Sequence, residues 1–396
     1  MDIQEKMHWM ALQFGLTENV FPVARQIVAQ YGSLASFWKS GDPAGLTAVP
    51  AAIREKLLIM RKKIIPEKLW DICRAKEAGV LCCVEEDYPK ELLHFSDCPV
   101  ILYYYGRRSL LNMPSAAIVG SRRSTAYGRK MAWDFAGAFA EAGLCVVSGM
   151  ARGIDAAAHG GALDARGDTI AVLGSGVNVP YPPDNQKLYR LLREEGLVIS
   201  EFFPGEKPLH WHFPLRNRII SGLSRFTLLV EGEAKSGALI TCDWAAEQGK
   251  DVWALPGPVT NPFSIGPLQL IRDGAMLAIT PEDILTAYFP GRYGQTGETE
   301  KKGRGIRRSR EGRACGDDEA QQVLFLSEKK ALAALSPGEK KLFESISYYP
   351  VHVDGLLALY SARQGAMAGG GLYMDLSKLQ ALRLIEKLPG DYYQRI

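Results

Sequence analysis

The segment from Ala116 to Gly160 constrains the fold of this chain more than any other part of the sequence. Within it, a short β-branched run stops at a turn of small residues and continues into an alanine-rich helical pattern, and this happens twice. The two runs are Ala117–Val119 and Cys145–Val147. A repeated strand–turn–helix unit predicts an α/β fold, with helices on the faces of a parallel sheet. Ligands of such sheets gather at the carboxyl ends of the strands, where helix N-termini present free N–H groups.

The alternation of short apolar runs and helical patterns continues to about Tyr288, and one extra strand is expected within Val100–Gly106. We therefore predict one α/β domain over residues 86–290. Its further strands are expected at Thr169–Leu173, Leu197–Ile199, Thr227–Val230, Asp251–Ala254 and Met276–Ile279. Its helices are expected at Asp184–Glu194, Pro214–Leu223, Ser236–Gln248 and Gly266–Asp273, with a capped helix from Thr280.

Different patterns flank this domain on both sides. Residues up to about Lys90 place apolar side chains at helical spacing, which predicts an all-helical domain over residues 1–85. Between Gly291 and Cys315 the chain has eight Lys or Arg, three Glu and no apolar period. Such a composition gives little reason to fold, so we expect residues 291–335 to be a disordered basic linker.

The final segment, residues 336–396, reads as three helices followed by a hairpin, which predicts a winged-helix-like domain. A turn is expected at the glycine triplet 369–371, and the third helix presents only Lys378 and Arg383 as basic groups. A protein-contact or vestigial role is therefore at least as reasonable for this domain as DNA binding. The helices are expected at Gly338–Ile346, Val351–Tyr360 and Asp375–Leu384, and the strands at Ile385–Leu388 and Asp391–Gln394.

Overall composition excludes several classes of protein. The formal net charge of +3 over 396 residues gives no reason by itself to expect a polyanionic partner. Seven cysteines without a C-x-x-C spacing predict a reduced, cytoplasmic protein and argue against a zinc site. The N-terminus lacks a signal-peptide pattern and no apolar run reaches membrane-spanning length, so we expect a soluble intracellular protein with no membrane partner.

Four clusters of small and basic residues fall at successive strand ends, and together they favour a phosphate-bearing ligand. The third cluster adds aromatic rings, and a basic groove with rings on which bases stack is typical of single-stranded nucleic-acid binding. We therefore predict a DNA-binding site without cofactor or metal. The clusters are Gly120, Ser121, Arg122 and Arg123; Ser148, Gly149, Arg152 and Gly153; Trp211, His212, Phe213, Arg216, Asn217 and Arg218; and Lys235, Ser236 and Gly237, with Ser236 as a helix N-cap.

Other interpretations of these residues remain open. The aromatic side chains of the third cluster are equally compatible with burial, and its arginines with ion pairs to Glu201 or Asp243. A dinucleotide fingerprint requires glycines where Arg122 and Arg123 stand, and the chain has no Walker lysine motif. The candidate catalytic groups, Asp155, His159, Glu201 and Glu231, form no nucleophile–base–orienter set by spacing, which favours binding over turnover.

The ordered motifs resemble the DNA-processing protein A (DprA, or Smf) family from about Tyr88 to Tyr288. The resemblance implies an extended Rossmann-like domain that binds single-stranded DNA as a homodimer and loads the RecA recombinase onto incoming DNA during natural transformation. It also implies a sterile-alpha-motif or helix-hairpin-helix-like N-terminal domain. The competing hypothesis is a Rossmann-type, phosphoribohydrolase-like nucleotide enzyme. The matching motifs are Val119–Gly128, Val147–His159, Tyr181–Asn185, Ser200–Glu201, Phe213–Ile220, Ser236–Thr241, Pro256–Gly257 and Leu270–Ala275.

Overall fold

A computed structural model of the chain describes residues 1–16, 19–95, 97–289, 335–346, 351–364, 369–382, 384–388 and 392–395. The chain divides into two compact units, Met1–Glu298 and Thr299–Ile396. The predicted linker lies outside the described residues except for Leu335, as do Arg383 and the Pro389-Gly390 turn. Disorder of the linker therefore stays a prediction.

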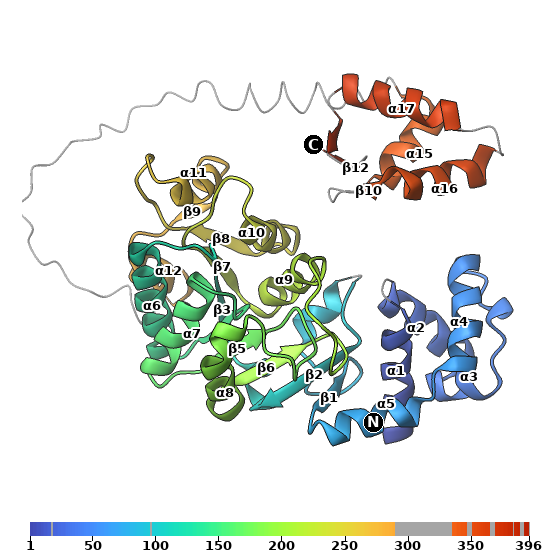
Figure 1. Cartoon of the computed structure of the whole chain (residues 1–396), viewed down its shortest axis with the longest axis horizontal. Helices are drawn as coiled ribbons and strands as arrows, with labels where there is room; N and C mark the ends of the chain where they lie inside the picture. The colour runs from blue at the N-terminus through green and yellow to red at the C-terminus, as the bar shows by residue number, and fades with distance from the viewer. Residues whose placement is uncertain are drawn as a thin grey trace, which may run out of the picture. The chain divides into compact units, whose positions relative to one another are not determined.

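The described part of the first unit contains a nine-stranded sheet with the order β1-β2-β6-β5-β4-β3-β7-β8-β9 (Figure 1). Strands β3 to β9 run parallel, while β2 is antiparallel to β6 and β1 is antiparallel to β2. The predicted α/β class is confirmed. The strands are β1 Gly79–Cys82, β2 Ile101–Gly106, β3 Ser115–Val119, β4 Cys145–Ser148, β5 Thr169–Val172, β6 Leu197–Ser200, β7 Phe226–Leu229, β8 Asp251–Ala254 and β9 Met276–Leu277.

The all-helical prediction for the first 85 residues is wrong at β1. Gly79 pairs with Tyr104 and Cys82 with Ile101, so this segment forms the edge of the sheet. A four-residue apolar run is too short for its periodicity to separate strand from helix. Pairing with β2, about twenty residues later in the chain, decides its structure.

Helices cover both faces of the sheet, and alternate residues of each strand face opposite layers. In β3, Ala116 and Ile118 pack in the core beneath α6 (Ala126–Glu141), α7 (Ile154–Asp164) and α12 (Pro281–Tyr288). Ala117 and Val119 pack in the core on the other face, beneath α8 (Gln186–Glu195), α9 (His212–Leu223) and α10 (Gly237–Glu247). Burial on both faces explains why the parallel strands are almost uniformly apolar. The remaining elements between strands are α11 Ile265–Arg272 and the 3₁₀ turns η2 Lys90–His94, η3 Arg108–Asn112, η4 Pro183–Asn185 and η5 Pro262–Ser264.

The N-terminal helices lie beside the β1–β2 edge and share a continuous hydrophobic core with the sheet (Figure 1). The side chain of Gln13 fastens them: its amide donates to the carbonyls of Ile101 (2.9 Å) and Glu201 (2.8 Å) and accepts from the Ile101 N–H (2.7 Å). This one glutamine joins the end of α1 to β2 and to the residue that follows β6. The helices are α1 Ile3–Gly15, α2 Val20–Tyr31, α3 Leu34–Ser40, α4 Ala51–Lys63 and α5 Pro66–Ala75, with the 3₁₀ turn η1 Pro43–Gly45.

The second unit consists, in its described residues, of three helices and an antiparallel sheet of order β10-β12-β11. The predicted turn at Gly369–Gly371 is wrong, because α17 begins at Gly369, and Val351–His352 is a strand rather than the start of a helix. Glycines are tolerated in a first helical turn, whose backbone N–H groups have no intrahelical partner. The elements are α15 Pro337–Ser345, β10 Val351–His352, α16 Val353–Gln364, α17 Gly369–Ala381, β11 Ile385–Leu388 and β12 Tyr392–Arg395.

None of the helices in the described ranges combines the length and apolar composition needed to cross a bilayer. Within the same ranges, no group of three or more His, Cys, Asp or Glu side chains is placed to hold a metal ion. The six described cysteines are buried free thiols, and Cys315 lies outside the described residues.

Candidate functional site

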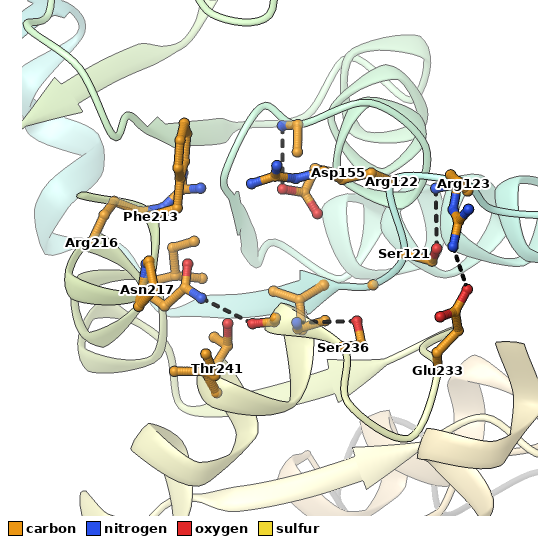
Figure 2. Close-up of a pocket in the computed structure, with 18 of the residues that line it drawn as sticks. Ser121, Arg122, Arg123, Asp155, Phe213, Arg216, Asn217, Glu233, Ser236 and Thr241 are labelled. Carbon is orange, nitrogen blue, oxygen red and sulfur yellow. Dashed lines mark hydrogen bonds and ion pairs between the residues drawn. The ribbon is translucent and has the colours of Figure 1, made fainter. Parts of the chain in front are cut away.

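A cavity of about 370 Å³ lies at the carboxyl ends of β3 and β7 (Figure 2). From β3 the chain proceeds to β4 on one side, and from β7 it proceeds to β8 on the other, so the cavity occupies a topological switch point of the sheet. All four predicted clusters lie at the end of the sheet where the parallel strands have their carboxyl ends, and a subset of their residues lines the cavity. The lining residues are Val119, Gly120, Ser121, Arg122, Arg123, Ala151, Asp155, His210, Phe213, Pro214, Arg216, Asn217, Ile220, Glu233, Ser236, Gly237, Ala238, Ile240 and Thr241.

The first wall of the cavity is the turn between β3 and α6. Ser121 fixes this turn, because its N–H donates to the Glu231 carbonyl (2.7 Å) and its hydroxyl accepts from the Arg123 N–H (3.1 Å). The Arg122 guanidinium lies over the Phe213 ring, 4.8 Å from its centroid. Arg123 is exposed and pairs with Glu233 at 2.7 Å (Figure 2). The turn therefore presents two guanidinium groups, one against a ring and one against a carboxylate.

The second cluster supports the first turn more than it lines the cavity. Gly153 has a φ of 77°, and a Cβ at this position would lie 2.3 Å from the Ser121 carbonyl oxygen, so only glycine fits. The Ser148 hydroxyl is buried and donates to the Ile118 carbonyl (2.7 Å). Gly149 accepts from Arg216 (2.8 Å), and Arg152 forms an exposed ion pair with Asp184.

The third cluster is divided between the two sides of α9. Phe213, Arg216 and Asn217 lie at i, i+3 and i+4 and share the side that lines the cavity. Arg216 is buried and donates to the Val172 carbonyl as well as to Gly149, while the Asn217 amide donates to the Gly237 carbonyl (3.2 Å). These contacts fix the positions of the Arg216 and Asn217 side chains in the cavity floor.

Trp211 and Arg218 do not line the cavity. The cavity therefore differs from the predicted groove, which used all the basic and aromatic groups of this cluster. Trp211 and Arg218 line a separate cleft of about 720 Å³ between α1 and the loop at residues 201–206. The buried Arg218 guanidinium pairs with Glu201 (2.6 and 2.7 Å) and Asp97 (2.7 Å), which is the ion-pair alternative open at the sequence level. Burial alone would lower the pKa of Arg218, but these carboxylates raise it overall.

His212 is also outside the cavity. Its ring is fully buried and stacks on Phe202 at a centroid distance of 3.8 Å. The helical period explains the division, since Trp211, the N-cap of α9, and positions 215 and 218 point away from positions 213, 216 and 217.

The fourth cluster is the start of α10. Ser236 is the N-cap of this helix, as predicted, and its hydroxyl accepts from the Ala238 N–H (3.3 Å). The free N–H groups of such a first turn favour an anion. Ser236 and Gly237 line the cavity, whereas Lys235 is exposed just outside its lining residues.

Two charged groups, Arg216 and Asp155, are buried in the cavity floor. Burial lowers the pKa of Arg216 to about 10, although the Asp155 carboxylate acts in the opposite direction. Burial raises the pKa of Asp155, opposed by Arg216 and by the Ala151 N–H, which lies 3.3 Å from the carboxylate. Arg216 therefore remains cationic at neutral pH and adds to the attraction for an anion.

The other candidate catalytic groups have structural partners. The Glu231 carboxylate accepts from the N–H (2.8 Å) and hydroxyl (2.6 Å) of Thr125, at the N-cap of α6. His159 is buried against the Thr169 hydroxyl (2.7 Å), and burial lowers its pKa to about 3. Glu201 is held by Arg218.

Several residues that line the cavity were not predicted as site residues from the sequence, and among them are the polar residues Glu233 and Thr241. Glu233 follows the end of β7 by four residues, so its place after a predicted strand was the available signal. A carboxylate is not expected at the predicted phosphate site, and only the structure shows that Glu233 pairs with Arg123. Thr241 lies one helical turn beyond Gly237 in α10, and its place at the end of the Ser236–Thr241 motif was the available signal.

Comparisons with a family model and with individual proteins identify the same family. Residues 79–289 match the family model described as DNA recombination-mediator protein A. The chain is 33% identical over 407 residues to Protein Smf of Synechocystis, covering 99% of each chain. It is 43% identical to the DNA processing protein DprA of Streptococcus pneumoniae, over 52% of this chain and 72% of that one.

Solved structures also resemble this one. The X-ray structure of DprA from Streptococcus pneumoniae aligns with a TM-score of 0.64 and 33% identity, covering 72% of this chain and 98% of that one. A structure of DNA processing protein A from Helicobacter pylori, which gave insight into the single-stranded DNA binding mode of that protein, aligns with a TM-score of 0.50 and 28% identity. That alignment covers 54% of this chain and 96% of that one.

Proposed function

The chain belongs to the DNA recombination-mediator protein A family, and from this premise we propose that it binds single-stranded DNA in the cavity between β3 and β7. The observation that carries the proposal is the convergence of three kinds of group in one cavity. They are the guanidinium groups of Arg122, Arg123 and Arg216, the N-terminus of α10, and the ring of Phe213. The Helicobacter pylori relative, whose structure addresses single-stranded DNA binding, supports the same ligand.

In the proposed complex, phosphates bind Arg122, Arg123 and the first turn of α10, and a base packs beside Phe213. Guanidinium groups and free backbone N–H groups are suited to phosphate oxygens, and an aromatic ring accepts any base. Lys235, exposed beside the N-cap of α10, adds a further phosphate contact. The binding is sequence-independent, because none of these groups reads a base edge.

The wider role we propose is that of a DNA-processing protein in recombination, which protects incoming single strands and delivers them to the RecA recombinase during natural transformation. We further propose a cytoplasmic homodimer without cofactor. The family membership and the relatives named DNA processing protein support this role. The engagement of Glu201, Glu231 and His159 in structural contacts supports a binding function rather than catalysis.

We also propose assignments for the two regions that flank the sheet domain in the sequence. The order α15-β10-α16-α17-β11-β12 supports a winged-helix-like assignment for the second unit, and the N-terminal helices are assigned to a sterile-alpha-motif or helix-hairpin-helix-like domain. Lys378, one of the two basic groups of the predicted third helix, is paired with Glu339 at 2.8 Å. This pairing supports a protein-contact or vestigial role for the winged-helix-like domain rather than DNA binding.

Fluorescence anisotropy tests the proposal directly. A labelled oligo-dT and a duplex of equal length are titrated with the full chain at 50 and 200 mM salt. We expect preference for the single strand and a loss of affinity at the higher salt, because bound phosphates displace counterions. No binding at the lower salt would overturn the proposal, and turnover of nucleoside monophosphates abolished by Glu231→Gln would favour the phosphoribohydrolase-like alternative.

A further inference from the structure

A second aromatic ring lies next to Phe213, outside the residues that line the cavity. Tyr181, in the loop between β5 and η4, has its ring centroid 5.5 Å from that of Phe213, with the two planes inclined by 40°. The Tyr181 side chain is 38% exposed, whereas Phe213 is only partly exposed. The two rings therefore form a short aromatic track that leads from the cavity toward solvent.

Much of the Phe213 ring is already in contact with protein. The Arg122 guanidinium lies over it, and a Cβ on Gly174 would lie 2.8 Å from its Cδ1 atom, so the Gly174 backbone packs closely against the ring. A base inserted between Phe213 and Tyr181 would need the rings roughly 7 Å apart, twice the contact distance of stacked carbon atoms. At 5.5 Å the pair is closed to insertion, and the more open aromatic surface is that of Tyr181.

The segment that carries Tyr181 is fastened to the second strand-end turn. The Asn185 amide donates to the carbonyls of Met150 (2.9 Å) and Ala151 (3.1 Å), and Asp184 pairs with Arg152. This anchoring explains why the Tyr181-to-Asn185 motif accompanies the strand-end turns in this sequence. A ring held in place before binding loses little conformational entropy when a ligand stacks on it.

We propose that Tyr181 stacks the base adjacent to the one at Phe213, so that the DNA site extends one nucleotide beyond the cavity. The proposal rests on the proposed single-stranded DNA binding and adds a specific contact to it. Tyr181 contacts the base through the face of its ring and carries no charge for a phosphate, and Asp184 of the same segment is paired with Arg152. The extended site takes any base, since stacking uses the π-face that all bases share.

The test compares two ligands of equal charge: a labelled oligo-dT and an oligonucleotide of the same length whose residues are abasic tetrahydrofuran. Both are titrated with wild type, Tyr181→Ala, Tyr181→Phe and the surface control Leu191→Ala, which shortens an exposed apolar side chain on α8. We expect Tyr181→Ala to weaken oligo-dT binding by roughly 5- to 150-fold, the range for loss of one stack, and to leave abasic binding unchanged. Tyr181→Phe and Leu191→Ala should match wild type.

A second readout guards against a general loss of structure. An oligonucleotide with one 2-aminopurine should lose fluorescence on binding wild type and Tyr181→Phe, and less on binding Tyr181→Ala at saturation. Equal affinity of Tyr181→Ala and wild type for oligo-dT would overturn the stacking role of Tyr181 but not the proposed function. So would an equal loss on both ligands, which indicates a structural role. If wild type binds neither ligand, the proposed function itself fails.

Discussion

Replacing Glu233 with glutamine should strengthen DNA binding, an unusual expectation for a change in a binding site. The Glu233 carboxylate forms an ion pair with the Arg123 guanidinium at 2.7 Å. The Glu233 side chain is 46% exposed and the Arg123 side chain 78% exposed. A phosphate that binds Arg123 must first displace this carboxylate. An exposed ion pair of this kind contributes about 0.2–1 kcal/mol. The variant lacks this ion pair, so phosphate binding to Arg123 no longer has to break it.

Repulsion adds to this competition. A phosphate about 7 Å from the Glu233 carboxylate is destabilised by roughly 0.6 kcal/mol in water, and salt reduces that value. The two contributions together give about 1 kcal/mol, which corresponds to an approximately fivefold lower Kd at low salt. The gain should shrink at high salt, because both groups are exposed.

The assay is anisotropy with labelled oligo-dT at 50 and 200 mM salt. Glu282→Gln is the matched control, because it removes the same charge from an exposed position in the first turn of α12, outside the cavity. Melting temperatures should be equal within a degree or two, since the Arg123–Glu233 pair is exposed. Binding by Glu233→Gln no tighter than that of Glu282→Gln would refute the reasoning and show that Arg123 does not meet a phosphate.

Three further results follow from the structure. Arg122→Ala and Lys235→Ala should each weaken single-strand binding by about 1–3 kcal/mol in the same titration; wild-type affinity in both would contradict the assignment of the site. Arg218→Ala should lower the free energy of unfolding by about 3–5 kcal/mol in a denaturant titration, because it leaves Glu201 unpaired, with little effect on DNA affinity; the reverse pattern would place Arg218 on the DNA. His159→Gln should flatten the pH dependence of the free energy of unfolding between pH 6.5 and 3. In the wild type, the His159 ring binds a proton in the unfolded chain but not in the folded state. Wild-type stability therefore falls as pH falls, by at most about 1.4 kcal/mol per pH unit. Burial of Asp155 acts in the opposite direction in both proteins, so equal pH slopes of wild type and variant would contradict the buried neutral state of His159.

The sequence by itself determined the α/β class, the positions of most strands and the strand ends at which the cavity lies. Parallel strands buried on both faces leave a strong local signal, because each is an apolar run ending at a small-residue turn. The capping role of Ser236 was equally local, since a serine before a helical pattern meets a donor two residues later. The assignment of β1 failed because its partner strand lies elsewhere in the chain.

Only the tertiary structure decided which residues share the cavity. Arg216 and Arg218 are two positions apart and look alike in sequence, yet the first lies in the cavity floor and the second in an ion pair with Glu201. The turn of α9 separates them, and the partners on each side come from other segments of the chain. The same holds for Glu233 against Arg123 and Tyr181 against Phe213. Local pattern specifies a secondary structure, whereas a binding surface depends on long-range contacts that the pattern does not encode.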